Sequence, residues 1–236
     1  MNPVRETLFK IHFFHKISPK EHKYLYLLIS LILLLLVSPF SSYSIVARFV
    51  YSVLVTIVTT SSLYAEYERK RVDYIEFSLG FLSIVFAWTD FFFPEIPFLD
   101  LGTLISFACF FLYFIIELIS RIVISPIVSM NLIYASIVGF MSIGLLGSIL
   151  AAIIHCVLPN AYNFTVDPKI HMFENYVYFS FMTVTTVGYG DILPIHPASK
   201  MLSVCLSISA QMYSTIVMGI LIGKFISAKK TKVLSK

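Results

Sequence analysis

Thr185-Thr-Val-Gly-Tyr-Gly-Asp191 is the stretch of sequence from which the architecture follows. Its two glycines, Gly188 and Gly190, are spaced by two residues. Glycine adopts a positive φ without steric cost, so it suits a backbone in which alternate residues have this conformation. Such a backbone points successive carbonyl oxygens in one direction. We therefore expect a short ribbon over 186–190 whose carbonyls face one way.

The oxygen atoms of this ribbon form a candidate cation site. Carbonyl oxygens in a row replace the water shell of a dehydrated cation. The expected ligands are four consecutive carbonyls and one hydroxyl: the carbonyls of Thr186, Val187, Gly188 and Tyr189, and the Thr186 hydroxyl. Gly190 completes the ribbon. The side chains of Val187 and Tyr189 are expected to point away from the cation and to wedge the ribbon against the surrounding helices.

Six apolar stretches make up most of the remaining sequence. The hydrocarbon core of a bilayer is about 30 Å thick, and a helix needs about 20 apolar residues to cross it. The stretches that approach this length cover 24–40, 44–64, 77–93, 101–124, 130–157 and 201–226. We therefore predict an all-α membrane protein with six transmembrane helices.

A shorter, semi-polar stretch over 173–192 lies between the last two of these helices. It is too short to span a bilayer, and re-entrant elements are tolerated only inside protein or beside a water-filled path. Residues 173–185 are expected to form a half-helix that enters from outside, with Glu174 near its positive end. Its C-terminal end would aim at the membrane centre, where the partial negative charge of that end favours a cation.

The composition excludes a water-soluble fold. Hydrophobic residues make up 58% of the 236 residues and charged residues 13%, with a mean hydropathy of +0.88. Soluble proteins contain about 25% charged residues. The basic residues flank apolar runs and form no patch with aromatic residues, so we expect no nucleic-acid partner. We find no soluble domain, nucleotide loop or metal cluster in the sequence, and we expect neither an enzyme nor a cofactor.

The distribution of basic residues predicts the orientation. They gather before the first helix (5–23), between the second and third (69–71) and after the sixth (224–236). With six spans, these regions fall on one side of a membrane, and the positive-inside rule makes that side the cytoplasm. We therefore predict a multi-pass protein of the cell membrane with both termini in the cytoplasm.

The segment Thr185 to Asp191 resembles the signature sequence of potassium channel pores, complete and without substitution. The order of outer helix, pore helix, selectivity-filter loop and inner helix resembles the same family over 130–230. The resemblance implies potassium ions at the carbonyls of 186–189, with Thr185 and Asp191 as filter support. The filter of this family is a ring of four ribbons. Because this chain has one ribbon, the resemblance implies a homotetramer around a tetrameric pore.

The six-helix layout resembles that of voltage-gated potassium channels in helix count and topology only. It implies a cytoplasmic N-terminus (1–23), a four-helix domain similar to a voltage sensor (24–125), a pore domain (126–228) and a short cytoplasmic tail (229–236). The implied function is passive conduction of potassium ions, in contact with membrane lipids.

Three other classes of membrane protein have related sequence features. A non-selective cation channel of the same fold usually has a degraded Gly-Tyr-Gly element, whereas Gly188 to Gly190 is intact. A potassium transporter subunit carries four pore loops in one chain, whereas this chain has one. An electrically silent or regulatory subunit stays open, as does an unlinked cytoplasmic regulator.

The pore region departs from the family in several places. Tyr178 and Phe179 replace frequent tryptophans, and the Tyr178 hydroxyl is expected to bond Asp191. Met182 stands where some members have a buried glutamate behind the filter. The inner helix has Ala210 at the usual hinge glycine, and its glycines lie lower. They are the candidate hinge positions Gly219 and Gly223, or sites of close helix packing.

Charges within the apolar stretches do not form a voltage sensor. Arg121 is the only basic residue of the fourth stretch, whereas steep gating uses about three to four charges per subunit. We therefore expect weak voltage dependence or none, and a local ion pair between Glu117 and Arg121. Arg48 and Asp90 lie at matching depths near the outer side. They either face each other, or Arg48 extends to the interface. The three cysteines (Cys109, Cys156 and Cys205) are expected to be buried.

Overall fold

The structure, a computed structural model, describes residues 22–38, 45–66, 74–93, 97–126, 128–164 and 172–234. Its elements follow in the order α2 (Lys23–Val37), α3 (Ile45–Glu66), α4 (Tyr74–Phe92), α5 (Pro97–Ile124), α6 (Met130–Val157), β1 (Tyr162–Phe164), α7 (Met172–Val184), β2 (Ile192–Pro194) and α8 (Pro197–Leu234). Most of the predicted N-terminal region and the basic turn at 69–71 lie outside the described residues, so the predicted orientation stays a prediction.

Five of these helices are long and apolar enough to cross a membrane, namely α3, α4, α5, α6 and α8. Helix α2 has 15 residues and is about 22 Å long, less than a hydrocarbon core of about 30 Å. Five of the six predicted spans therefore have helices of sufficient length in the described part of the chain. The first predicted span, over 24–40, stays a prediction because residues 39–44 are not described.

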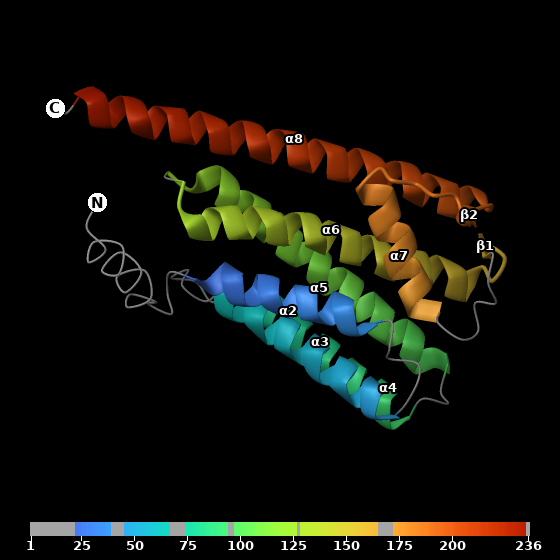
Figure 1. Cartoon of the computed structure of the whole chain (residues 1–236). Helices are drawn as coiled ribbons and strands as arrows, with labels where there is room; N and C mark the ends of the chain where they lie inside the picture. The colour runs from blue at the N-terminus through green and yellow to red at the C-terminus, as the bar shows by residue number, and fades with distance from the viewer. Residues whose placement is uncertain are drawn as a thin grey trace, which may run out of the picture.

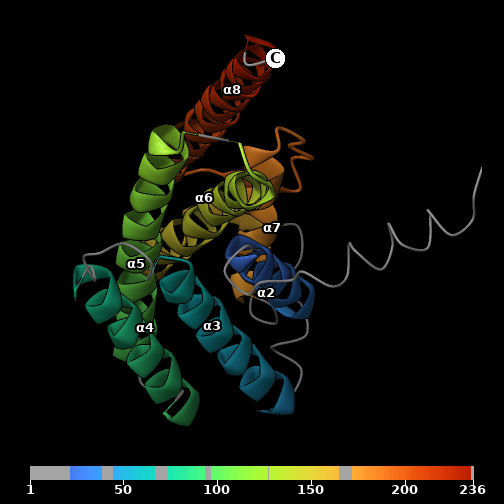
Figure 2. The same cartoon turned by 90° about the vertical axis from the view of Figure 1, so that its left-hand side faces the viewer.

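Helix α6 lies at the centre of the molecule (Figure 1). It contacts α2 and α5 on one side and α7 and α8 on the other. Helices α2 to α5 pack in chain order into a four-helix group, and Figure 2 shows α6 and α7 between this group and α8. The four-helix group therefore packs directly on the helices that carry the glycine-containing ribbon.

The core of the four-helix group is built from large apolar side chains. Phe110 and Phe114 of α5 stack with their ring centroids 6.4 Å apart and are fully buried. Leu27 and Leu31 of α2 are buried in the same cluster. Because lipid tails are as apolar as these side chains, close van der Waals packing, and not removal from water, holds such helices together in a membrane.

The helix boundaries follow local sequence rules. Helix α6 covers Met130–Val157, as expected, and begins at the N-cap Ser129, whose hydroxyl accepts a hydrogen bond from the Leu132 amide. Helix α5 begins earlier than expected, at Pro97, because proline suits the first helical position. Helix α8 runs from Pro197 to Leu234 and thus continues through the predicted boundary at 228/229.

A two-stranded antiparallel sheet, which the sequence did not predict, joins the loop after α6 to the segment between the ribbon and α8. Strands β1 and β2 pair Tyr162 with Pro194 and Phe164 with Ile192. The Ser199 hydroxyl of α8 also donates a 2.7 Å hydrogen bond to the Ala161 carbonyl. The sheet thus ties the loop after α6 to the segment that follows the ribbon.

Candidate functional site

Helix α7 is held against α6 by small residues and one buried hydrogen bond. The Ser180 hydroxyl donates a 2.6 Å hydrogen bond to the carbonyl of Gly144, and Ser180 is fully buried. A Cβ atom at Gly144 would lie 2.8 Å from the Phe181 ring, and one at Gly147 would meet the Ser180 hydroxyl and Leu206. Close packing of this kind fixes the position from which the chain enters the ribbon.

The end of α7 leads directly into the ribbon through a series of backbone hydrogen bonds. The amide of Thr186 donates to the Thr183 carbonyl, and the amide of Gly188 donates to the Met182 carbonyl, both at 3.1 Å. The Thr185 hydroxyl donates to the Phe181 carbonyl at 2.6 Å. These bonds satisfy carbonyls that the helix end leaves without intrahelical partners. The start of the ribbon is therefore fixed relative to the helix.

Positive φ angles alternate along the ribbon. Gly188 has a φ of 55° and Gly190 a φ of 80°, as the sequence predicts, and Thr186 has a φ of 62°. Added Cβ atoms at Gly188 and Gly190 would have no neighbour within 4 Å, so a larger side chain would fit. Glycine is favoured at these positions because of their positive φ. The positive φ of Thr186 was not predicted from the sequence, because threonine is β-branched and rarely adopts this conformation.

The large side chains of the ribbon are exposed in the single chain. Val187 is 49% exposed and Tyr189 is 73% exposed. The helices of the same chain therefore do not provide the surrounding wall against which these side chains were expected to pack. A hollow of about 200 Å³ beside the ribbon is lined by Tyr178, Met182 and Asp191.

The Tyr178 hydroxyl lies within hydrogen-bonding reach of the Asp191 side chain beside this hollow, and the role of this contact in supporting the ribbon stays a prediction. The hydrogen bond to the Asp191 side chain raises the pKa of the Tyr178 hydroxyl above its usual value of 10.0. An Asp191 side-chain oxygen also accepts a 3.2 Å hydrogen bond from the amide of Ile192. Asp191 thus connects α7 with the chain that leaves the ribbon, while Met182 lines the hollow beside it.

The candidate hinge positions lie within one uninterrupted helix. Helix α8 has 38 residues and shows no break at Ala210, Gly219 or Gly223. Ala210 is buried, whereas added Cβ atoms at Gly219 and Gly223 would meet nothing within 4 Å. Close packing within one chain therefore does not explain these two glycines, and their hinge role stays a prediction.

Arg121 contacts neighbouring helices at the end of the four-helix group where α2 begins and α3 ends. Its guanidinium donates a 3.1 Å hydrogen bond to the Ala65 carbonyl near the end of α3 and a 3.4 Å hydrogen bond to the Tyr24 hydroxyl of α2. A cation is favourable beside the negative end of a helix. These contacts give Arg121 a structural use, and the ion pair with Glu117 stays a prediction.

Asp90 interacts with Arg48 and also has a partner that the sequence analysis missed. The Asp90 carboxyl lies within hydrogen-bonding reach of the Asp100 carboxyl. It also interacts with the charge of the Arg48 guanidinium. The sequence analysis placed Asp100 in a loop before the fourth span. Because α5 begins at Pro97, Asp100 lies in its first turn instead. Pro97 is the sequence feature from which this earlier helix start could have been predicted, because proline suits the first helical position.

Two contacts of α8 were also missed. The Tyr213 hydroxyl donates a 2.9 Å hydrogen bond to the Ser136 carbonyl of α6, in a space that Gly139 leaves open. The Lys224 ammonium donates hydrogen bonds to the carbonyls of Ile122 and Val123, at 2.6 and 2.9 Å. Lys224 had been used only as an orientation marker.

The prediction that the cysteines are buried is wrong for the single chain. The three thiols are exposed, because no other element of this chain covers the helix faces on which they lie: Cys109, Cys156 and Cys205. Their placement in apolar stretches indicates membrane helices and does not by itself indicate burial against protein.

The comparisons with known proteins bear on the segment from α6 to α8. Residues 145–227 match a family model described as an ion channel, and the match covers about a third of the chain. No curated protein and no solved structure matches the chain. The matched segment begins within α6 and ends within α8, so it includes α7 and the whole ribbon. Together with five apolar helices long enough to cross a bilayer, this match supports an ion channel in a membrane protein.

Proposed function

We propose that four copies of this chain form a potassium-selective channel, with the ribbon 186–190 of each copy lining the axial path. The observation that carries the proposal is the alternation of positive φ at Thr186, Gly188 and Gly190. Alternation of this kind aligns the intervening carbonyls, and aligned carbonyls replace the hydration shell of a potassium ion. The complete Thr-Val-Gly-Tyr-Gly sequence at these positions supports potassium over other cations.

The need for further copies is supported by the apolar surface that the single chain leaves exposed. Among the apolar side chains of α8 that are more than half exposed, five recur every three or four residues, which places them on one face of the helix. They are Met201, Val204, Ile208, Met212 and Ile216. With the exposed Val187 and Tyr189, they provide a surface for neighbouring copies around a fourfold axis.

The charge pattern supports conduction that depends little on voltage. Moving one charge across a membrane potential of 100 mV changes the energy by about 2.3 kcal/mol. Arg121 is the only basic residue of α5, and its guanidinium is bonded to α2 and α3. We therefore propose that the four-helix group serves another purpose than sensing voltage.

The experiment that tests this function is ion flux into liposomes that contain the purified protein alone. We expect potassium uptake at least tenfold faster than sodium uptake, a ratio that corresponds to about 1.4 kcal/mol. The conductance, which is the flux divided by the electrochemical driving force, should change little when the membrane potential is varied.

Each alternative gives a different result in the same experiment. Equal fluxes of potassium and sodium would identify a non-selective cation channel. Protein that inserts, forms tetramers and yet conducts neither ion would identify a silent subunit. A steep increase of flux with voltage would contradict the interpretation of Arg121.

A further inference from the structure

A cavity of about 340 Å³ lies between the four-helix group and the helices that carry the ribbon. It is lined by residues of α2 to α7, and its lining includes Phe173 and Tyr176 of α7. Ligand sites in proteins have volumes of about 300–1,000 Å³ and are mostly apolar with a few polar groups. The volume therefore fits one small ligand and is too small for a two-chain lipid.

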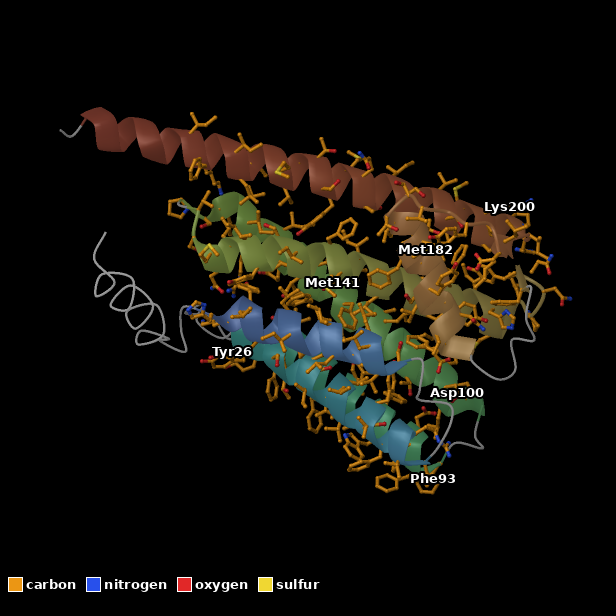
Figure 3. The ribbon with its side chains drawn as sticks, viewed as in Figure 1. Tyr26, Phe93, Asp100, Met141, Met182 and Lys200 are labelled. Carbon is orange, nitrogen blue, oxygen red and sulfur yellow. The ribbon has the colours of Figure 1, made fainter. Side chains whose placement is uncertain are left out.

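The cavity has an apolar interior and a polar mouth. Among the lining residues, Val58, Phe107 and Phe111 are buried, whereas Asp100 and Cys156 are exposed. Figure 3 shows Asp100 at the end of α5 beside the start of α7. A ligand in this cavity would therefore place an apolar part between the helices and a polar part at the mouth.

Two carboxyl groups meet at the mouth. The Asp90 and Asp100 side chains both line the cavity and lie within hydrogen-bonding reach of each other. Two carboxyl groups this close repel each other when both are ionised, so they either share one proton or both stay ionised around another cation. The Arg48 guanidinium also acts on Asp90, but it is a single positive charge beside two carboxyl groups. The mouth therefore favours a cationic group.

The cavity lining also contains a buried hydroxyl group without a hydrogen-bond partner. Tyr176 is 2% exposed, and its hydroxyl is buried and makes no hydrogen bond. By contrast, the hydroxyls of Ser52, Thr59 and Thr103 in the same lining donate to carbonyls of their own helices. A buried polar group without a partner costs about 1–3 kcal/mol. Cys156 interacts electrostatically with both Asp100 and Tyr176, so the three lie in one part of the cavity.

We propose that this cavity is a binding site for a single-chain amphipathic amine. The protonated amine has three N–H donors, and the site provides matching acceptors in Asp90, Asp100 and the Tyr176 hydroxyl. The ammonium group replaces the proton between the two carboxyls. The alkyl or aromatic part of the ligand lies against the apolar interior.

The position of the site connects the ligand to the ribbon. Tyr176 and Phe173 belong to α7, whereas Asp90 and Asp100 belong to α4 and α5. A bound amine therefore contacts the four-helix group and the helix that leads into the ribbon at the same time. The site does not depend on potassium selectivity, and its test does not use conduction.

The test uses the thiol of Cys156 as a reporter, because this residue lines the cavity and is exposed. Full-length protein with Cys109→Ser and Cys205→Ser is labelled with a maleimide in the presence of decylamine or decanol. At about ten times the Kd of the amine, about one tenth of the sites are free. We expect decylamine to slow labelling by about tenfold and decanol to slow it much less. Protein that keeps only Cys205, on α8, controls for effects on the reagent.

Variants identify the residues that hold the ammonium group. Asp90→Asn with Asp100→Asn should remove the protection, whereas Glu117→Gln, deeper on α5 and outside the cavity lining, should keep it. Tyr176→Phe, a smaller change in case the double variant does not fold, should weaken the protection several-fold. Equal protection by decanol, no protection by decylamine, or undiminished protection in the two-asparagine variant would overturn the proposal.

Discussion

Thr186 is the residue of the ribbon with the most unusual conformation. Its φ of 62° lies in the left-handed region, which β-branched residues rarely adopt. Strain of this size costs of order 1–3 kcal/mol and persists only where the surrounding structure fixes it. The hydrogen bonds from the amides of Thr186 and Gly188 to α7 provide that fixation. The alternation at Gly188 and Gly190 was predictable from their spacing, whereas the conformation of Thr186 depends on its contact with α7.

The glycines of the ribbon give the first prediction. Alanine at Gly188 or Gly190 meets no neighbour but must adopt a positive φ, at roughly 1–2 kcal/mol for each residue. In the proposed tetramer, four copies would multiply this cost. We therefore expect Gly188→Ala and Gly190→Ala to reduce potassium flux at least tenfold.

The matched control is Gly219→Ala, since an added Cβ there is also unobstructed but the backbone is helical. Its flux should fall less than that of the ribbon variants, because Gly219 is a candidate hinge position but its helical backbone needs no positive φ. If the ribbon variants conduct as well as this control, the backbone conformation of the ribbon is not needed for conduction.

The bond between Tyr178 and Asp191 gives the second prediction. Tyr178→Phe removes the hydroxyl and leaves Asp191 without this donor, so the conducting ribbon should be shorter-lived. We expect faster decline of single-channel activity, with unchanged protein yield. The hydrogen bond raises the pKa of the Tyr178 hydroxyl. The hydroxyl therefore keeps its proton, and the bond persists, at pH values somewhat above the usual tyrosine pKa. Identical activity of the variant would show that the bond has no role.

The close packing of α7 against α6 was not predictable from the sequence. Gly144 and Gly147 look like ordinary glycines of a membrane helix. Only the structure shows that they face Phe181, Ser180 and Leu206 at close range. Contacts of this kind depend on which helices are neighbours, and periodicity along one helix does not give that information.

The third prediction concerns this packing. A Cβ at Gly147 would meet the Ser180 hydroxyl and come within 2.7 Å of Leu206. Overpacking of this kind costs typically about 1–3 kcal/mol. Gly147→Ala should therefore lower the thermal unfolding temperature in detergent, whereas Gly219→Ala should raise it slightly, because alanine favours a helix by about 1 kcal/mol. A shift of the same sign in both variants would argue against close packing at Gly147.

The fourth prediction concerns the link between α5 and α8. The Lys224 ammonium bonds two carbonyls in the last turn of α5, where a cation is favourable. Lys224→Met should lower the thermal stability by about 1 kcal/mol, since hydrogen bonds to charged groups contribute about 1.5–3 kcal/mol before solvent screening.

Lys200, at the other end of α8 in Figure 3, provides the control for this change. Lys200→Met removes the same charge from the same helix and should leave stability unchanged, because this lysine is exposed. Equal losses in the two variants would point to net charge and not to the contact with α5.

At the scale of the whole molecule, apolar run length predicted the main elements well. Helix α6 has the bounds expected from the sequence, and four other long helices lie where the apolar stretches are. Charge partners were less predictable. Matching depth indicated that Asp90 and Arg48 interact, but it did not reveal Asp100, because its assignment depended on the start of α5. Side-chain partners across helices depend on rotation about the helix axes, which run length does not fix.

Under the proposed function, the single chain is incomplete as a channel. Its ribbon exposes Val187 and Tyr189, and one face of α8 presents apolar side chains without a cover from the same chain. Only an assembly around a common axis would bring several ribbons together, and only the ring formed in this way would surround a dehydrated ion with carbonyl oxygens. The central claim is therefore about the geometry of an assembly.

The most direct test of this claim is a cryo-electron microscopy structure of the purified protein in potassium chloride. The account predicts four chains around one axis, with the carbonyls of 186–189 facing it and ion density between successive carbonyl rings. In sodium chloride without potassium, this density should weaken or shift. An assembly with another number of chains, or one in which Gly188 and Gly190 lie away from the axis, would contradict the account.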